Sequence, residues 1–246
     1  MNLQGIAGVI IFTLSMLRQI DPNEVYVVVP AFNEDAVIRQ VVNDLLGLHY
    51  KVVIVDDGSE DHLCTLLSDL PVFCLRHKVN VGQGVALQAG IAFALSKQAN
   101  YIVTFDGDGQ HQAMDIGKLL LPLINNEADI TLGSRFLPGA DHNMPASRRL
   151  LLQIGRRLNF LLTGLLLTDA HNGLRAMNRK AAAAIQITEN GMAHATELLT
   201  QIKKKKLRYK EVPVTIRYTD YSKKKGQSAW ASFRIFFDLL LNKIFK

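Results

Sequence analysis

The first half of the chain alternates short apolar runs with amphipathic segments. Residues 25–29 read Val-Tyr-Val-Val-Val, a continuous apolar run typical of a strand buried on both faces. Segment 34–46 follows after Pro30, and its apolar residues recur at every fourth position, as on one face of a helix. The same alternation predicts strands at 52–55, 72–75, 101–105 and 128–133, and helices at 61–67, 84–97 and 114–123. Strands that alternate with helices indicate an α/β fold with a mainly parallel, Rossmann-like sheet flanked by helices.

The second half of the chain is less regular. Its pattern predicts a long apolar helix at 147–167, a helical region at 189–206, a strand at 212–218 and an amphipathic helix at 229–245. No internal repeat or low-complexity linker divides the chain. We therefore predict an apolar N-terminal segment (1–20), one domain (21–221) and a C-terminal amphipathic extension (222–246).

The net charge of +6 conceals two halves of opposite sign. Residues 1–123 carry 7 Lys+Arg against 13 Asp+Glu, whereas residues 124–246 carry 21 against 9. A basic chain can indicate a protein that binds nucleic acid. No RNA-binding motif of aromatic and basic residues accompanies the charge, so we expect no nucleic-acid partner. The composition, with 48% apolar and 20% charged residues, excludes a disordered or collagen-like chain.

Two features bear on the compartment. Cys64 and Cys74 have no metal-ligand or C-x-x-C spacing, so we expect two separate structural thiols in a reducing environment. The apolar run 5–17 is shorter than the ~18–20 residues that span a bilayer. It also lacks a basic flank and a small-residue cleavage pattern, which argues against a secretion signal. We therefore expect a cytoplasmic protein.

Polar and acidic residues follow three of the predicted strands. Asn33 follows the first, Asp56 and Asp57 end the second, and Asp106-Gly107-Asp108 directly follows the fourth. Ligands of such sheets bind outside the carboxyl ends of the strands, so these side chains are expected to converge. Two carboxylates in a turn, with Gln110 and His111 beside them, suit a hard cation such as Mg²⁺ or Mn²⁺ that bridges to a phosphate.

Two other turns are candidate ligand contacts. Asp56 and Asp57 precede Gly58, which allows the backbone to approach a ligand, and their carboxylates can accept from a nucleobase or a ribose hydroxyl. The turn Gly82-x-Gly84 precedes a predicted helix and resembles a phosphate cradle. It lacks both the dinucleotide-binding spacing and the Walker lysine.

Five motifs occur in order: Val-Pro-Ala-Phe-Asn-Glu at 29–34, Val-Asp-Asp-Gly-Ser at 55–59, Asn-x-Gly-x-Gly-x-Ala-Leu at 80–87, Phe-Asp-Gly-Asp-Gly-Gln-His at 105–111 and Gly-Ser-Arg-Phe at 133–136. Together they resemble the family 2 glycosyltransferases of the GT-A fold. Among these, the chain is most similar to the dolichol-phosphate mannose synthase-like branch, whose acceptors are polyprenyl phosphates. The resemblance implies an inverting, metal-dependent transfer from a UDP- or GDP-sugar to a polyprenyl phosphate for cell-envelope glycan synthesis.

The resemblance also implies a role for each matching residue. The nucleotide-sugar would be bound by Pro30, Asn33, Glu34, Asp56, Asp57, Gly82, Asp106, Gly107 and Asp108. The metal would be held by Asp106, Asp108 and Gln110, and the acceptor phosphate by Arg135, Arg148, Arg149 and Arg175. Asp108, Arg135, Arg175 and Glu197 would serve catalysis, with Glu197 matching a carboxylate position of the family. Gln83 and Gln112-Ala113 depart from residues common in the family.

The basic half carries apolar helix faces rimmed by arginine and lysine, at 147–167 and 229–245, with lysine runs at 203–206 and 223–225. Such faces suit the cytoplasmic surface of an anionic membrane. Core packing, a homo-oligomer interface or a membrane-protein partner are the alternatives. Two other functions stay open: transfer to a sugar hydroxyl of a cell-envelope polysaccharide, where Glu197 would act as general base, and a non-catalytic scaffold that binds nucleotide-sugar at the membrane.

Overall fold

The computed structural model describes residues 21–61, 63–140, 155–157, 159–191 and 193–217. The terminal segments 1–20 and 222–246, together with Arg148 and Arg149, lie outside these ranges. The strands are β1 (Val25–Ala31), β2 (Lys51–Asp56), β3 (Phe73–Arg76), β4 (Tyr101–Thr104), β5 (Ile130–Ser134), β6 (Arg175–Asn178) and β7 (Tyr209–Pro213). The helices are the 3₁₀ turn η1 (Pro22–Glu24), α2 (Asp35–Leu46), α3 (Leu63–Leu66), α4 (Gln83–Ser96), α5 (Asp115–Ile124), α7 (Arg179–Ala184) and α8 (His194–Lys204).

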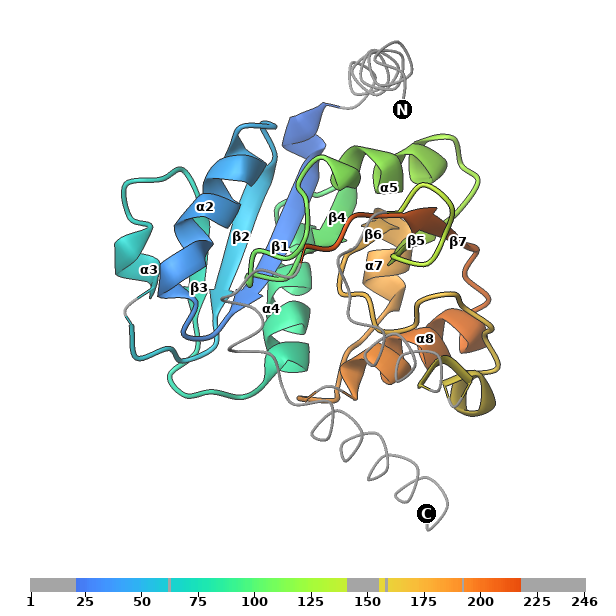
Figure 1. Cartoon of the computed structure of the whole chain (residues 1–246). Helices are drawn as coiled ribbons and strands as arrows, with labels where there is room; N and C mark the ends of the chain where they lie inside the picture. The colour runs from blue at the N-terminus through green and yellow to red at the C-terminus, as the bar shows by residue number, and fades with distance from the viewer. Residues whose placement is uncertain (1–20, 62, 141–154, 158, 192, 218–246) are drawn as a thin grey trace.

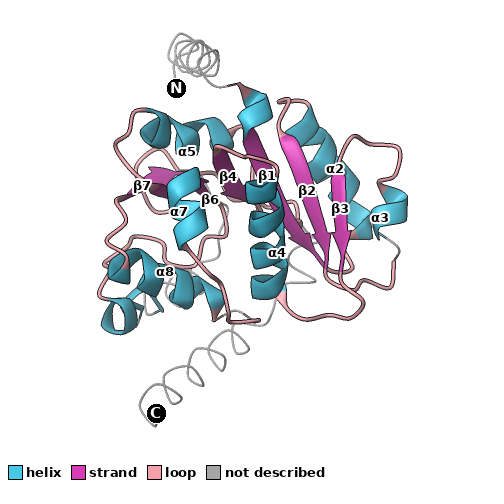
Figure 2. Ribbon diagram, turned by 180° about the vertical axis from the view of Figure 1, so that it is seen from behind, coloured by secondary structure: helices cyan, strands magenta, loops and turns pink. Residues whose placement is uncertain are grey.

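The strands form one seven-stranded sheet in the order β3-β2-β1-β4-β6-β5-β7. Every neighbouring pair is parallel except those of β6, which runs antiparallel to β4 and to β5. Helices α2 and α5 cover one face, whereas α4, α7 and α8 cover the other (Figures 1 and 2). The predicted α/β fold with a mainly parallel sheet is therefore confirmed.

The core explains why the apolar runs become central strands. Successive residues of β1 alternate between the two core clusters, so that Val27 packs with α2 and α5 and Val28 packs with α4. All seven residues of β1 are buried. A strand with helices on both faces must be apolar at every position, and this requirement produces the run at 25–29.

The structure corrects the predictions for the second half. The strand expected at 212–218 is β7, which begins and ends earlier, and the helix expected at 189–206 begins only at His194. Strand β6 and helix α7 carried no recognisable pattern. With only four residues, Arg-Ala-Met-Asn, β6 is too short to show an alternation.

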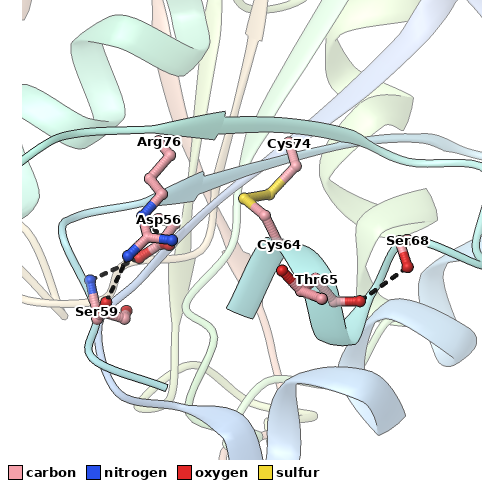
Figure 3. Close-up of a disulfide and its surroundings, with 7 residues drawn as sticks. All are labelled: Asp56, Ser59, Cys64, Thr65, Ser68, Cys74 and Arg76. Carbon is pink, nitrogen blue, oxygen red and sulfur yellow. Dashed lines mark hydrogen bonds and ion pairs between the residues drawn. A yellow bond between two sulfur atoms is a disulfide. The ribbon is translucent and has the colours of Figure 1, made fainter. Parts of the chain in front are cut away.

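A disulfide joins Cys64 of α3 to Cys74 of β3, with 5.8 Å between the Cα atoms (Figure 3). The expectation of two separate thiols is wrong, because the crossover from α3 into the edge strand β3 brings the two side chains together. Arg76 follows on the same strand, where its Nη2 donates to the Ser59 carbonyl at 3.0 Å and its Nε lies 3.4 Å from Asp56. The disulfide therefore ties β3 to α3, and Arg76 on the same strand contacts the end of β2.

An ion pair between Asp129 and Arg208 ties β5 to the segment before β7. The buried Asp129 carboxylate accepts from the Arg208 backbone N at 3.0 Å, from Nε at 3.2 Å and from Nη2 at 2.9 Å. These hydrogen bonds to Arg208 hold the pKa of Asp129 well below its usual value. A carboxylate with a depressed folded-state pKa stabilises the fold above its unfolded pKa of about 4, and this stability is lost as the pH falls further.

We expect Asp129→Asn to destabilise the protein by about 2 kcal/mol at pH 7, because Arg208 loses its charged partner. The melting temperature at neutral pH should fall by roughly 4–8 °C, and the variant should lose less stability than the parent on acidification. Calorimetry between pH 7 and pH 3 measures both effects. Asp69→Asn, which breaks the exposed Arg39–Asp69 pair, is the control and should change little. Equal effects of the two substitutions would contradict a special stabilising role of the Asp129–Arg208 ion pair.

Candidate active site

The carboxyl ends of β2, β1 and β4, three neighbouring strands, meet at one edge of the sheet. The segment 106–108 leaves β4 here, close enough to the end of β1 that a Cβ on Gly107 would lie 3.2 Å from the Pro30 carbonyl oxygen. Asn33 joins the turns after β1 and β2, since its backbone N donates to Ser59 Oγ at 3.0 Å and its Oδ1 accepts from the Glu60 N at 3.1 Å. The structure thus brings the predicted strand-end residues together.

The Asp106 carboxylate is held from several sides. Its Oδ2 lies 3.0 Å from His111 Nε2, and its Oδ1 accepts from Gln83 Nε2 at 3.0 Å. Gly173, just before β6, packs so closely that a Cβ there would collide with the carboxylate. Burial alone would raise the pKa of Asp106, but the His111 hydrogen bond and the charge of Arg175 bring this pKa below its usual value.

Asp108 and Gln110 form the second part of the turn. Asp108 Oδ1 accepts from the Gln110 backbone N at 3.0 Å, and Oδ2 accepts from its side-chain Nε2 at 2.5 Å. Burial and the nearby Asp106 charge both raise the pKa of Asp108. Two like charges in a half-buried turn, lined by carboxylate and amide oxygens, fit a hard divalent cation that would offset their repulsion. Across the described part of the chain, no three His, Cys, Asp or Glu side chains gather into a metal site.

The segment that follows β7 contacts the turn at 106–111. The sequence pattern did not predict this contact. His111 and Ile216 form an isolated antiparallel bridge, and the Arg217 N donates to the Gln110 carbonyl at 3.0 Å. Next to them, the Thr215 N donates to the buried Asp115 carboxylate at 2.6 Å. The turn at 106–111 is therefore fixed by a segment about 100 residues away in the chain.

Asp56 and Asp57 lie at the edge as predicted, but their carboxylates are engaged within the protein. Asp56 Oδ1 accepts from the Ser59 N at 2.8 Å, and Arg76 approaches Oδ2. Asp57 Oδ1 lies 2.8 Å from His77 Nδ1, and its Oδ2 accepts from the Gly82 N at 2.7 Å. Asp57 thus orients the glycine turn, in addition to the nucleotide contact that the resemblance implies.

The glycine turn itself faces another loop. Gly82 has a φ of 103°, and the Gly84 N donates to the Asn190 carbonyl at 2.8 Å. A Cβ on either glycine would collide with the carbonyls of Glu189 and Asn190. The two glycines are therefore required by the close approach of loop 188–191. The resemblance of Gly82-x-Gly84 to a phosphate cradle did not predict this contact.

The two described arginines of the predicted acceptor site differ in their surroundings. Arg135, just after β5, is buried against Asp169, with 2.5 Å from Nε to Oδ2 and 3.3 Å from Nη2 to Oδ1. Arg175, the first residue of β6, is only 3% exposed and lies near the charges of Asp106 and Asp169. Burial lowers its pKa and both carboxylates oppose that shift. Within the described residues, its guanidinium has no hydrogen-bond partner.

Two histidines near Arg175, the half-buried His171 and the buried His194, had no sequence signal. Burial lowers the pKa of His171 and of His194, and the charge of Arg175 lowers both further. His194 begins α8 and its Nδ1 lies 2.8 Å from the Gly191 carbonyl. Both rings are therefore favoured as neutral imidazoles at neutral pH.

Comparison with known proteins decides the family. The sequence model of the glycosyl transferase family 2 matches residues 26–185. The chain belongs to glycosyltransferase family 2. Among its relatives, a UDP-N-acetylglucosamine–dolichyl-phosphate N-acetylglucosaminyltransferase of Methanococcus voltae is 34% identical and covers 90% of this chain and 97% of its own. An undecaprenyl-phosphate mannosyltransferase of Micrococcus luteus is 28% identical over 78% of this chain and 82% of its own.

The fold of this family 2 glycosyltransferase also has solved counterparts. Glucosyl-3-phosphoglycerate synthase from Mycobacterium tuberculosis, crystallised with Mn²⁺, UDP and glucosyl-3-phosphoglycerate, superposes with a TM-score of 0.63 at 18% identity. The match covers 82% of this chain and 74% of the other. It confirms the predicted GT-A architecture. In the described ranges, no helix is both long enough and apolar enough to cross a membrane.

Proposed function

We propose that the enzyme transfers a sugar, with inversion, from a UDP- or GDP-sugar to a polyprenyl phosphate at the cytoplasmic surface of a membrane. The observation that carries the proposal is Arg175, a nearly buried guanidinium without a hydrogen-bond partner among the described residues, close to the Asp106 side of the site. A buried cation with unused donors suits a phosphate, which a guanidinium binds through two parallel hydrogen bonds. The names of the relatives from Methanococcus voltae and Micrococcus luteus both specify a polyprenyl phosphate, which supports this choice.

The donor would lie along the edge formed by β2, β1 and β4. Pro30, Asn33, Glu34, Asp56 and Asp57 would contact the base and ribose. Asp106, Asp108 and Gln110 would hold Mg²⁺ or Mn²⁺, which supplies charge stabilisation for the departing diphosphate. The Mn²⁺ and UDP named for the Mycobacterium tuberculosis enzyme support this part of the proposal.

The reaction needs little proton transfer. A phosphate oxygen of the acceptor forms the bond to the anomeric carbon, while the bond from that carbon to the nucleoside diphosphate breaks and its electron pair leaves with the diphosphate. Attack from the opposite side inverts the anomeric centre. Because the acceptor is already an anion, Arg175 and Arg135 would orient and partly neutralise it, and no general base is required.

An exposed apolar surface supports a membrane location for the acceptor. Leu161 and Leu166 are 74% and 59% exposed, and the exposed Lys203 lies beside Gly164, between them. Apolar side chains next to lysines favour the interface of an anionic bilayer.

The proposal is tested by incubating the protein with Mn²⁺, undecaprenyl or dolichyl phosphate and a panel of radiolabelled UDP- and GDP-sugars. We expect one donor to yield a labelled product that extracts into organic solvent, and chelation of the metal to abolish it. The proposal fails if no donor labels the lipid. Label found only on a cell-envelope polysaccharide supplied in a parallel incubation would favour the hydroxyl acceptor, and binding of UDP without turnover would indicate a scaffold.

A further inference from the structure

Glu197 in the first turn of α8 is fully engaged with a neighbouring loop. Its two carboxylate oxygens accept from the Thr188 backbone N at 3.1 and 3.0 Å, and Oε1 accepts from the Thr188 hydroxyl at 2.5 Å. Oε2 also accepts from the Glu189 N at 3.0 Å. A carboxylate with three donors, two of them backbone groups, is held in one orientation and satisfies amides that would otherwise lack partners.

The loop that Glu197 holds is the one that packs against the glycine turn. Directly after the two amides bound by Glu197, the Asn190 carbonyl accepts from the Gly84 N at 2.8 Å. His194, in the same turn of α8 as Glu197, completes the contact, since a Cβ on Gly84 would lie 2.9 Å from its Cβ. Loop 188–191 is therefore fixed at one end by α8 and packs with its carbonyls on the start of α4.

The start of α4 is connected in turn to both halves of the donor edge. The Gly82 N donates to Asp57 at 2.7 Å, and the Gln83 side chain donates to Asp106 Oδ1 at 3.0 Å. A displacement of the glycine turn would thus be felt by one carboxylate at the end of β2 and by another after β4. Direct hydrogen bonds and van der Waals contacts therefore lead from Glu197 through loop 188–191 to the glycine turn, which contacts Asp57 and Asp106 separately.

We infer that Glu197 is a positioning residue that holds the donor site in shape through loop 188–191, and not a general base. The inference rests on the proposed function, because it concerns binding of the nucleotide and its metal. With a hydroxyl acceptor, by contrast, Glu197 would act as the general base. The positioning role fits a phosphate acceptor, which needs no base.

The test uses Glu197→Gln and Thr188→Val in the full chain. The amide of Gln places an N–H group against the loop amides, and Val removes the hydroxyl that Glu197 binds while leaving the carboxylate untouched. Both variants should weaken binding of UDP with Mn²⁺, measured by calorimetry without acceptor, by about tenfold and about threefold respectively. The donor KM should rise in parallel, whereas kcat should stay within about threefold of the parent.

A second measurement needs no substrate. Hydrogen exchange of the peptide around residues 81–88 should accelerate in both variants, because the Gly84 amide loses a fixed acceptor. Thr200→Val is the matched hydroxyl control, since the Thr200 hydroxyl donates to the Thr196 carbonyl within α8. Glu127→Gln is the carboxylate control, since Glu127 pairs with Lys210 away from the site. Neither control should change exchange in this peptide.

The outcomes separate the inference from the function on which it rests. A thousandfold loss of kcat in Glu197→Gln, with unchanged UDP affinity, unchanged exchange and a silent Thr188→Val, would overturn the positioning role and favour a general base. Failure of the parent protein to bind UDP, GDP or any of their sugar conjugates would overturn the proposed function. In that case the exchange result still decides whether Glu197 holds the glycine turn.

Discussion

Asp108→Asn is expected to lower turnover about a thousandfold or more and to leave the fold intact. The substitution removes one of the two charges that would hold the divalent cation, and the cation contributes several kcal/mol to stabilising the leaving diphosphate. A loss of about 4 kcal/mol corresponds to roughly a thousandfold in rate. Binding of Mn²⁺ in the presence of UDP, followed by electron paramagnetic resonance, should weaken together with turnover.

The same substitution should not destabilise the protein. Burial and the Asp106 charge already disfavour ionised Asp108, so a neutral side chain of the same shape relieves repulsion. We expect the melting temperature to stay constant or rise. Asp44→Asn, which removes an exposed carboxylate from α2, is the control and should retain both activity and Mn²⁺ affinity. A fully active Asp108→Asn variant would refute the metal assignment.

Gly173→Ala is expected to lower turnover and Mn²⁺ affinity at least a hundredfold through a single methyl group. The added Cβ would collide with the Asp106 carboxylate, which is held by His111 and Gln83 and has little room to move. A misplacement of about 1 Å in a catalytic group costs on the order of a hundredfold in rate. Steady-state kinetics and the same Mn²⁺ titration measure the two effects.

Gly191→Ala is the matched control for this prediction. The Gly191 carbonyl lies against His194 Nδ1, and His194 in turn packs against Gly84 of the glycine turn. A Cβ on Gly191 would nevertheless meet nothing within 4 Å. The control should therefore behave like the parent. If both alanine variants remain fully active, the close packing of Gly173 against Asp106 has no functional role.

The convergence of the strand-end residues could be predicted from the sequence because its evidence is local. Strands β1, β2 and β4 are apolar runs buried on both faces, and each is followed at once by its polar residues. The rule that ligands bind at the carboxyl ends of such strands then predicted the cluster that the structure contains. The contacts of Glu197 and the Arg135–Asp169 pair could not be predicted, because they join segments without a shared periodicity.

The disulfide escaped prediction for a related reason. Cysteine spacing identifies metal and redox motifs, whereas the pairing of Cys64 with Cys74 depends on where the edge strand β3 lies relative to α3. Likewise, β6 offered no apolar run, and its place in the sheet follows from its two neighbours. Elements of this kind are recognised from tertiary packing only.

The reversed direction of β6 has a consequence for how Arg175 reaches the site. In a parallel strand the last residue lies at the ligand edge, but in β6 it is the first, with Arg175 paired in register with Thr104 at the end of β4. The guanidinium of Arg175 thus reaches the site through the register of the antiparallel pair β4–β6, and not from a loop. Since neighbouring residues of a strand face opposite sides, deletion of Ala176 or Met177 would turn the guanidinium to the other face of the sheet. Length changes in this short strand should be tolerated far less than in the loops that bear the acidic residues.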